Sequence, residues 1–115
     1  MTILYGIPNC DTCRKARRWL DAAGIEYTFH DLRAAGVNPK SLQRWLDAAG
    51  QDTVLNRRGT TWRKLPETAK AALTEKKVFQ LLLEHPTLSK RPVQEAGKHC
   101  LVGFDADAWQ RVLRV

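Results

Sequence analysis

One stretch at the start of the chain carries the strongest structural pattern, and at residues 2–13 it reads TILYGIPNCDTC. Residues 2–6 are a short apolar run that predicts a β-strand, and the Gly, Pro and Asn after it predict a turn. Beyond the turn, apolar residues recur at helical spacing, so a helix is predicted from Asn9 or Cys10 to Gly24. Asn9 is expected to cap this helix, which places Cys10 in its first turn, directly after a strand.

The following segments extend this start into an α/β pattern. Between Glu26 and Asp31 aromatic residues alternate with polar ones, which predicts a second strand and therefore a β-α-β unit. The next helix is predicted from Asn38 to Gly50, because Pro39 suits a first helical position and an apolar stripe follows it. That stripe consists of Leu42, Trp45, Leu46 and Ala49.

The second half of the chain predicts short helices and then a hairpin. Residues 51–83 favour short helices around a polar turn at 56–61, and Pro86 is expected to end the last of them. Residues 91–95 and 99–104 predict two strands, and Asp105 is expected to start a final helix. The order βαβ, helices, ββα is that of a thioredoxin-like α/β fold with a mixed sheet. We therefore expect one domain over residues 1–115, with a central helical insertion at roughly residues 36–85.

Length and composition agree with a single globular domain. The 115 residues are 43% hydrophobic and 27% charged, which suffices for one buried core but not for two. No apolar run approaches the roughly 20 residues that cross a bilayer, and no basic lead-in precedes the first apolar residues. Three cysteines, an odd number, do not suit a secreted disulfide framework. We therefore expect a soluble, cytoplasmic monomer without membrane contact.

The chain is basic, with a formal net charge of +7 and a pI of about 9.7. This charge indicates an anionic partner, namely a nucleic acid, an oxyanion or an acidic peptide such as glutathione. The Lys and Arg residues are spread along the chain without a nucleic-acid-binding motif, so most are expected on the solvated surface. A nucleic-acid partner is therefore not favoured.

The motif Cys10-Asp11-Thr12-Cys13 carries the chemistry of the candidate site. Its spacing puts two sulfurs about one helical turn apart, near enough for a disulfide. Free helix amides, the helix dipole and the nearby Arg14 favour a reactive Cys10 thiolate, whereas Asp11 opposes it. Lowering a thiol pKa from about 8.5 to about 6.5 raises the thiolate fraction at neutral pH from roughly 3% to roughly 75%.

Other interpretations of the cysteines stay open. Cys13 could pack under the helix simply as a small apolar residue. Zinc would need a second ligand pair, and the spacing of His30, His85, His99 and Cys100 is not that of a zinc site, so no metal is expected. Cys100 lies in an apolar run and is interpreted as a buried strand residue.

The Arg91-Pro92 pair is the second feature that points to a site. An X-Pro peptide at the start of a strand is a common place for a cis bond, and in thioredoxin folds that proline faces the cysteine. Arg91 would then point its donors into the pocket and hold a carboxylate, an oxyanion or a substrate peptide. The alternative for Arg91 is an exposed surface charge.

At these residues the chain resembles the arsenate reductase (ArsC)/Spx family, most closely its YffB branch, over nearly its whole length. The resemblance rests on residues 5–12, 29–31, 55–65, 90–92 and 101–104, in this order. It implies a thioredoxin-like core with a helical insertion, Cys10 as the nucleophile, and a cationic pocket built by arginines from separate segments.

The family resemblance also implies roles for individual positions. Arg58 matches a pocket arginine in the middle block, and Arg91 matches the arginine before the cis-proline. Lys98 lies near the position of a further arginine in arsenate reductases. The residues predicted to bind substrate or glutathione are Arg14, Arg58, Arg91, Pro92 and Lys98.

One departure from the arsenate reductase pattern bears on the reaction. Enzymes of that type carry Cys-x-x-Ser-Arg, where this chain has Cys10-Asp11-Thr12-Cys13-Arg14. A cysteine in place of that serine is similar to the Spx switch. The resemblance therefore implies two candidate catalytic cysteines, Cys10 and Cys13.

Three functions are consistent with the resemblance. The first is glutathione-dependent thiol reduction, in which Cys10 forms a mixed disulfide and the cations bind the carboxylates of glutathione, with no bound cofactor. Either Cys13 or glutathione then releases Cys10. The second is arsenate reduction, with the same cations around a tetrahedral oxyanion. The third is a Spx-like regulator that binds RNA polymerase and uses the two cysteines only as an oxidation switch.

Overall fold

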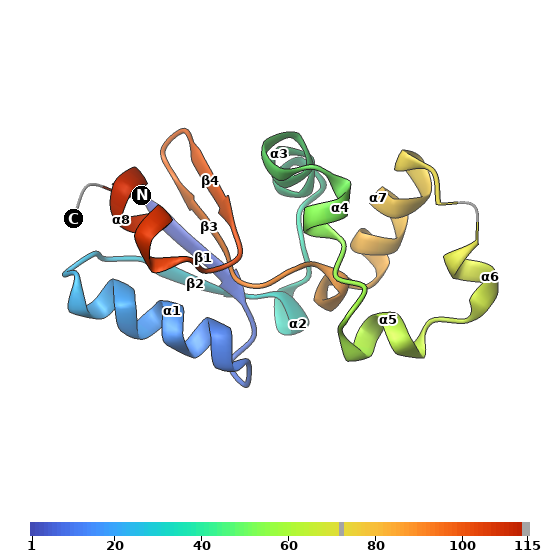
Figure 1. Ribbon diagram of the computed structural model, residues 1–115, viewed down its shortest axis with the longest axis horizontal. Helices are drawn as coiled ribbons and strands as arrows, with labels where there is room; N and C mark the ends of the chain where they lie inside the picture. Colours follow the sequence, from blue (N-terminus) through green and yellow to red (C-terminus); the bar gives the residue numbers. More distant parts are fainter. Residues whose placement is uncertain (72, 114–115) are drawn as a thin grey trace.

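The computed structural model describes residues 1–71 and 73–113. At its centre is a four-stranded mixed sheet in the order β2-β1-β3-β4 (Figure 1). The strands are β1 (Thr2–Gly6), β2 (Thr28–Asp31), β3 (Val93–Ala96) and β4 (His99–Val102). Strand β1 pairs parallel with β2 and antiparallel with β3, which pairs antiparallel with β4. The mixed sheet and the order βαβ, helices, ββα are those predicted from the sequence.

Two helices from the ends of the chain cover one face of the sheet. Helix α1 (Asp11–Ala22) follows β1, and helix α8 (Ala106–Leu113) follows β4 (Figure 1). They enclose a small core formed by Leu4, Ala16, Leu20 and Trp109. Because successive residues of a strand point to opposite faces, Leu4 faces these helices and Tyr5 faces away from them.

The helical insertion packs against the other face of the sheet. Its helices are α2 (Leu32–Ala35), α3 (Pro39–Ala49), α4 (Gln51–Val54), α5 (Thr60–Lys64), α6 (Glu67–Lys70), α7 (Glu75–Glu84) and a 3-10 helix (Pro86–Leu88). Tyr5 and Val93 of the sheet meet Trp45, Val78 and Leu82 of the insertion in the larger core. In Figure 1 helices α4 to α7 lie on the right and α3 in the middle, whereas α1 and α8 lie on the left.

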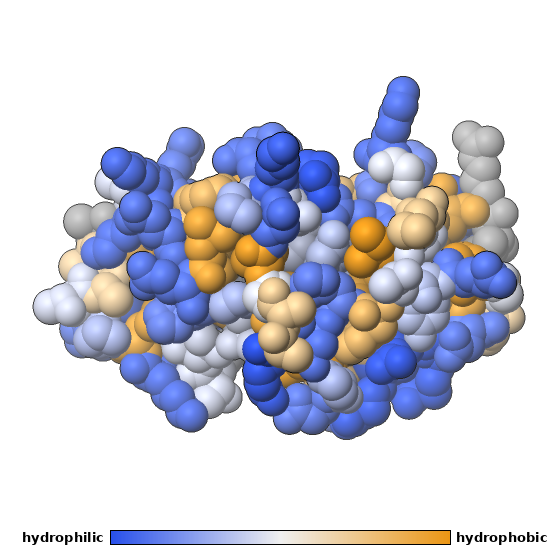
Figure 2. All heavy atoms as spheres, turned by 180° about the vertical axis from the view of Figure 1, so that it is seen from behind, coloured by the Kyte–Doolittle hydropathy of each residue, from blue (hydrophilic) through white to orange (hydrophobic). Residues whose placement is uncertain are grey.

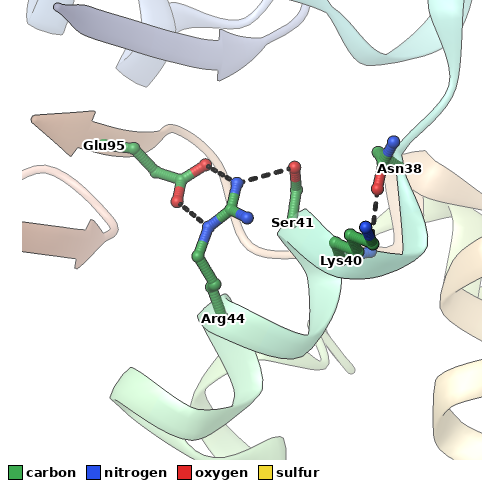
Figure 3. A network of polar contacts seen from close by, with 5 residues as sticks. All are labelled: Asn38, Lys40, Ser41, Arg44 and Glu95. Carbon is green, nitrogen blue, oxygen red and sulfur yellow. Dashed lines mark hydrogen bonds and ion pairs between the residues drawn. The ribbon is translucent and has the colours of Figure 1, made fainter. Parts of the chain in front are cut away.

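A bidentate ion pair joins helix α3 to strand β3 (Figure 3). Arg44 donates through Nε to Glu95 Oε2 at 2.7 Å and through Nη2 to Oε1 at 3.2 Å. The same Nη2 reaches Ser41 Oγ at 3.0 Å. Burial is the largest influence on the Glu95 carboxyl and raises its pKa, but hydrogen bonds led by those from Arg44 outweigh burial, so the pKa is lowered. The pair therefore holds the insertion against the sheet through a charged carboxylate.

Helix α3 forms as its sequence predicts. Asn38 caps it by accepting a hydrogen bond from the Lys40 backbone N–H at 2.8 Å, and Pro39 is its first residue. The chain leaves the helix at Gly50, whose φ of +84° is in the left-handed region that favours glycine.

The start of α1 differs from the prediction. Cys10 is the N-cap residue, with an extended backbone (φ −105°, ψ 123°), and the helix begins at Asp11. The Cys10 carbonyl already accepts the Arg14 N–H at 2.9 Å, which is the bonding expected of an N-cap. Asn9 does not cap the helix, because its Oδ1 accepts from Arg33 Nη1 at 3.5 Å. Cys10 therefore lies just before the first turn and not within it.

Smaller differences concern the ends of other elements. Strand β2 begins at Thr28, two residues later than predicted. Helix α2 was not predicted, and it forms because the Asp31 side chain accepts from the backbone N–H groups of Arg33 (2.9 Å) and Ala34 (3.3 Å). Strand β3 begins only at Val93, after a proline that has no N–H to donate to a ladder.

The face of the molecule behind the view of Figure 1 is mainly hydrophilic. Figure 2 shows the face behind that of Figure 1, where small apolar patches lie between hydrophilic side chains. Within residues 1–71 and 73–113, no helix combines the length and apolar character needed to cross a membrane.

Candidate active site around Cys10

Cys10 lies where an inner strand of the sheet leads into a helix. Strand β1 ends at Gly6, residues 7–9 form the turn, and Cys10 caps α1. Its side chain is half-buried, and the thiol is free of disulfide bonds. The unbonded amides of the first helical turn and the helix dipole favour negative charge at this place. The local chain path therefore supports a thiolate at Cys10.

Cys13 sits directly beneath this position in α1. Its side chain is completely buried, and it packs against Gly6 at the end of β1. A Cβ atom on Gly6 would lie 2.6 Å from the Cys13 sulfur, so a larger residue there would displace the thiol. Glycine at position 6 is thus required by the close approach of helix and strand.

The two thiols have pKa values shifted in opposite directions. Burial is the largest influence on Cys10 and raises its pKa, but hydrogen bonding from the Cys13 backbone and thiol, together with the Arg91 guanidinium, outweighs burial, so the pKa is lowered. Burial raises the pKa of Cys13 to about 12, and the nearby Cys10 thiolate adds to the rise. Of the two thiols, Cys10 is therefore the one that loses its proton first, and Cys13 keeps its proton as a donor.

Arg91 is fixed beside Cys10 by backbone carbonyls. Its Nη1 donates to the carbonyl oxygen of Thr87 and, at 3.5 Å, to that of Ser89. The Thr87 hydroxyl in turn lies 2.8 Å from the hydroxyl of Thr61 in α5. The Nε atom of Arg91 is buried and has no partner among the described protein groups. The Arg91–Pro92 peptide is cis, and Pro92 is buried.

An open pocket of about 750 Å³ adjoins Cys10. Three separate segments form its wall: the start of α1, residues 52–58 of α4 and the turn after it, and the two residues before the cis-proline. Its cationic side chains are Arg57, Arg58, Lys90 and Arg91. Among the described residues of the wall, Asp52 is the one carboxylate. The pocket therefore places the Cys10 thiol beside a site with a surplus of positive charge, which suits an anionic ligand.

The turn that carries Arg58 is held to the rest of the insertion by hydrogen bonds. The Asn56 N–H donates to the Leu88 carbonyl at 3.0 Å, and the Asn56 side chain accepts from the Arg58 N–H at 3.0 Å. Arg63 Nη2 donates to the Arg58 carbonyl, also at 3.0 Å. A Cβ on Gly59 would lie 2.9 Å from Asn56 Nδ2, so the turn closes tightly there.

The structure does not bring every predicted binding residue to the pocket. Arg14 forms an ion pair with Asp11 and donates to the Pro8 carbonyl at 3.4 Å, outside the pocket wall. Lys98 lies in the turn of the β3–β4 hairpin. The β1–β3 register pairs Thr2 with Ala96, so this turn is at the end of the sheet opposite to Cys10. This corrects the prediction that Lys98 joins the pocket.

Sequence reasoning missed other wall residues. Arg57 and Lys90 are next to Arg58 and Arg91, within the segments that carry the family resemblance, and that adjacency was the available signal. Asp52 lies before those segments, and no pattern in the sequence marked it.

Cys100 differs from the other two cysteines in its position and surroundings. It is half-buried in β4, where it pairs with Glu95 of β3. Burial, reinforced by the Glu95 charge, raises the pKa of Cys100 to about 11. It is not part of the wall of the Cys10 pocket, so its protonated thiol serves as a strand residue that packs against the larger core.

Comparisons with known proteins extend these observations. The sequence profile of the ArsC family matches residues 5–112. The solved structure of a protein named YffB is 50% identical, has a TM-score of 0.94, and the match covers 98% of this chain and 99% of that one. An arsenate reductase (ArsC) related protein from Brucella melitensis is 39% identical, with a TM-score of 0.73. This match covers 99% of this chain and 95% of that one. The global transcriptional regulator Spx of Listeria innocua is 30% identical over 115 residues, which are 98% of this chain and 87% of that protein.

These matches cover almost the whole chain, and they include the segments that form the pocket. The resemblance seen in the sequence is confirmed, as is the thioredoxin-like architecture with its helical insertion. Because the family profile extends from Tyr5 to Val112, the chain belongs to the ArsC family.

Proposed function

We propose that the protein is a glutathione-dependent thiol reductase whose nucleophile is Cys10. The observation that carries this proposal is the pocket, in which a cysteine of lowered pKa shares one wall with four cationic side chains. Membership of the ArsC family supports a thiol-based reductase. The two carboxylates of glutathione are the kind of group that the arginines of this wall bind, because guanidinium forks match carboxylates.

The proposed reaction consists of two thiol–disulfide exchanges. In the first, the Cys10 thiolate attacks the glutathione sulfur of a mixed disulfide, a Cys10–glutathione bond forms, and the substrate leaves as a thiolate that takes a proton from solvent. In the second, the thiolate of another glutathione attacks that bond. Glutathione disulfide leaves, and the Cys10 thiolate is restored. One glutathione thiol is thus consumed for each mixed disulfide: its sulfur leaves joined to the glutathione that the substrate carried, and the substrate is left as a thiol.

The high pKa of Cys13 supports a mechanism in which glutathione, and not Cys13, releases Cys10 from the mixed disulfide. A thiol with a pKa of about 12 carries almost no thiolate at neutral pH, and the thiolate is the attacking form. Cys13 instead stabilises the Cys10 thiolate by hydrogen bonding. In this proposal Cys13 is a donor that activates the nucleophile.

The size of the pocket supports a thiol peptide over arsenate. At about 750 Å³ it lies in the range of about 300–1,000 Å³ that is usual for organic ligands. A tetrahedral oxyanion would occupy a small part of this space and leave several of the cations without a partner.

Mass spectrometry after treatment with glutathione disulfide tests the proposal. We expect one glutathione on Cys10 in the wild type and in Cys13→Ser, and none on this position in Cys10→Ser. Reduced glutathione should then remove the adduct in both proteins that carry it. A wild-type protein that forms no adduct would refute the proposal. If the wild type loses the adduct but Cys13→Ser does not, the thiol that attacks the mixed disulfide is that of Cys13.

A second candidate function is redox-dependent regulation of transcription. The match to the Spx regulator of Listeria innocua favours it, since it spans 98% of this chain. In this case Cys10 and Cys13 would form a disulfide that changes the affinity for RNA polymerase. A pull-down with purified RNA polymerase, using the reduced and the oxidised protein, tests this candidate. Recovery of polymerase in either state would support it, and no recovery in both states would exclude it.

A further inference from the structure

One ion pair in the wall of the Cys10 pocket is unusually loose. Asp52, in α4, and Arg57, in the turn after it, both line the pocket. Arg57 Nη2 lies 3.9 Å from Asp52 Oδ1, whereas a charge-assisted hydrogen bond between such groups is about 2.7–2.9 Å long. The Asp52 side chain is 92% exposed and that of Arg57 is 52% exposed. Both groups therefore keep hydrogen-bonding capacity for a ligand.

Arg57 has a second contact that holds its guanidinium in place. The guanidinium carbon lies 5.7 Å from the centre of the Trp62 ring in α5, which is within the range of a cation–π contact. Arg57 is thus held between an aromatic face and a carboxylate, and it does not depend on Asp52 alone for its position.

The charges of the pocket distinguish between possible anionic ligands. Arg58, Lys90 and Arg91 attract carboxylates, but a carboxylate that approaches Arg57 also meets the negative charge of Asp52. A ligand that carries an ammonium and a carboxylate on the same carbon avoids this conflict. Its carboxylate can replace Asp52 as the partner of Arg57, while its ammonium replaces Arg57 as the partner of Asp52. All four charges are then paired.

We infer that the Asp52–Arg57 pair binds the zwitterionic α-amino-acid end of a γ-glutamyl thiol. Asp52 accepts hydrogen bonds from the ammonium, and Arg57 donates to the adjacent carboxylate. The carboxylate at the other end of the ligand is left to Arg58, Lys90 and Arg91. This inference rests on the proposed function and adds to it a reason for selecting γ-glutamyl thiols over thiols that are merely anionic.

The test compares two disulfides as reagents for Cys10. One is glutathione disulfide, and the other is its deamino analogue, in which hydrogen replaces each ammonium group. The second-order rate of Cys10 modification is measured by mass spectrometry for the wild type, Asp52→Asn and Glu67→Gln. Glu67 is a matched control, because its side chain is also 92% exposed and lies 3.6 Å from a lysine, Lys70, but it is outside the pocket wall.

We expect the wild type and Glu67→Gln to react about threefold to fivefold faster with glutathione disulfide than with the deamino analogue, a ratio typical of an exposed charge pair. In Asp52→Asn the ratio should fall to one. Equal rates in the wild type, or a preference that Asp52→Asn retains, would overturn the inference while leaving the proposed function intact. If neither disulfide modifies Cys10, the inference and the proposed function both fail.

Discussion

The thiol of Cys13 packs directly against the α-carbon of Gly6, so closely that a methyl group on Gly6 would lie 2.6 Å from the sulfur. We therefore predict that Gly6→Ala displaces the Cys13 thiol from Cys10. The variant should lose about 1–3 kcal/mol of unfolding free energy, as overpacked sites do, and the pKa of Cys10 should rise. Urea unfolding and an ultraviolet titration of thiolate absorbance measure the two effects.

Cys13→Ala provides the control for this prediction. It removes the sulfur with which the new methyl group collides, so Gly6→Ala should be tolerated in the Cys13→Ala background. An equal loss of stability in both backgrounds would show that the Gly6 methyl group meets something other than Cys13.

The hydrogen-bonding role of Cys13 leads to a second prediction. Cys13→Ala removes a donor to the Cys10 thiolate, so the pKa of Cys10 should rise and its alkylation by iodoacetamide at neutral pH should slow several-fold. Cys13→Ser retains a donor of similar size and should slow the reaction less. If the two variants have the same rate as the wild type, Cys13 does not activate Cys10.

A third prediction concerns the charge beside Cys10. Arg91→Met removes a guanidinium that stabilises the thiolate, so the thiolate fraction at neutral pH and the rate of mixed-disulfide formation should fall by about tenfold, which corresponds to roughly one pKa unit. Lys98→Met removes one positive charge at the opposite end of the sheet and should change neither quantity. Similar losses in both variants would indicate that net charge, and not the position of Arg91, governs the reaction.

The Arg44–Glu95 pair predicts a specific pH dependence of stability. The pKa of Glu95 is lower in the folded protein than its usual value. Its contribution to stability is therefore complete above the unfolded pKa of about 4.3 and is lost as the pH falls through the folded pKa. Glu95→Gln should cost about 1 kcal/mol at neutral pH, a modest figure because Arg44 is half-exposed.

Urea unfolding of wild type and Glu95→Gln at neutral and acidic pH measures this effect. The difference between the two proteins should shrink once the pH is below the folded pKa of Glu95. Glu67→Gln, which removes an exposed carboxylate from α6, serves as the control and should have little effect at either pH. A difference that persists unchanged in acid would contradict the assignment to the charged form of Glu95.

Much of the fold could be predicted because its signals are local. The apolar run of β1, the helical spacing of α1 and the Asn-Pro start of α3 each lie within a dozen residues, and each depends on neighbours in the chain. The cap of α1 was harder to predict, because Asn9 and Cys10 compete for one position. Arg33, which binds the Asn9 side chain, is distant in the sequence.

Local signals predicted only part of the candidate site. Cys10 could be singled out from its own segment, Arg91 from the proline that follows it, and Arg58 from a family resemblance. Lys98 was misplaced because its position depends on the β1–β3 register, which sets the end of the sheet at which the hairpin turns. Asp52 was missed because an exposed acid in the first turn of a short helix looks like any solvated surface residue until the folded chain places it beside the pocket.

The wall of the Cys10 pocket is formed by separate parts of the chain, which can change independently in sequence. The nucleophile and its activating thiol belong to the sheet and its first helix, whereas Asp52, Arg57 and Arg58 belong to the insertion. Reactivity and selectivity are thus encoded in different stretches of sequence. We therefore expect substitutions within residues 51–64 to change which anion the pocket binds while the sulfur keeps its intrinsic reactivity.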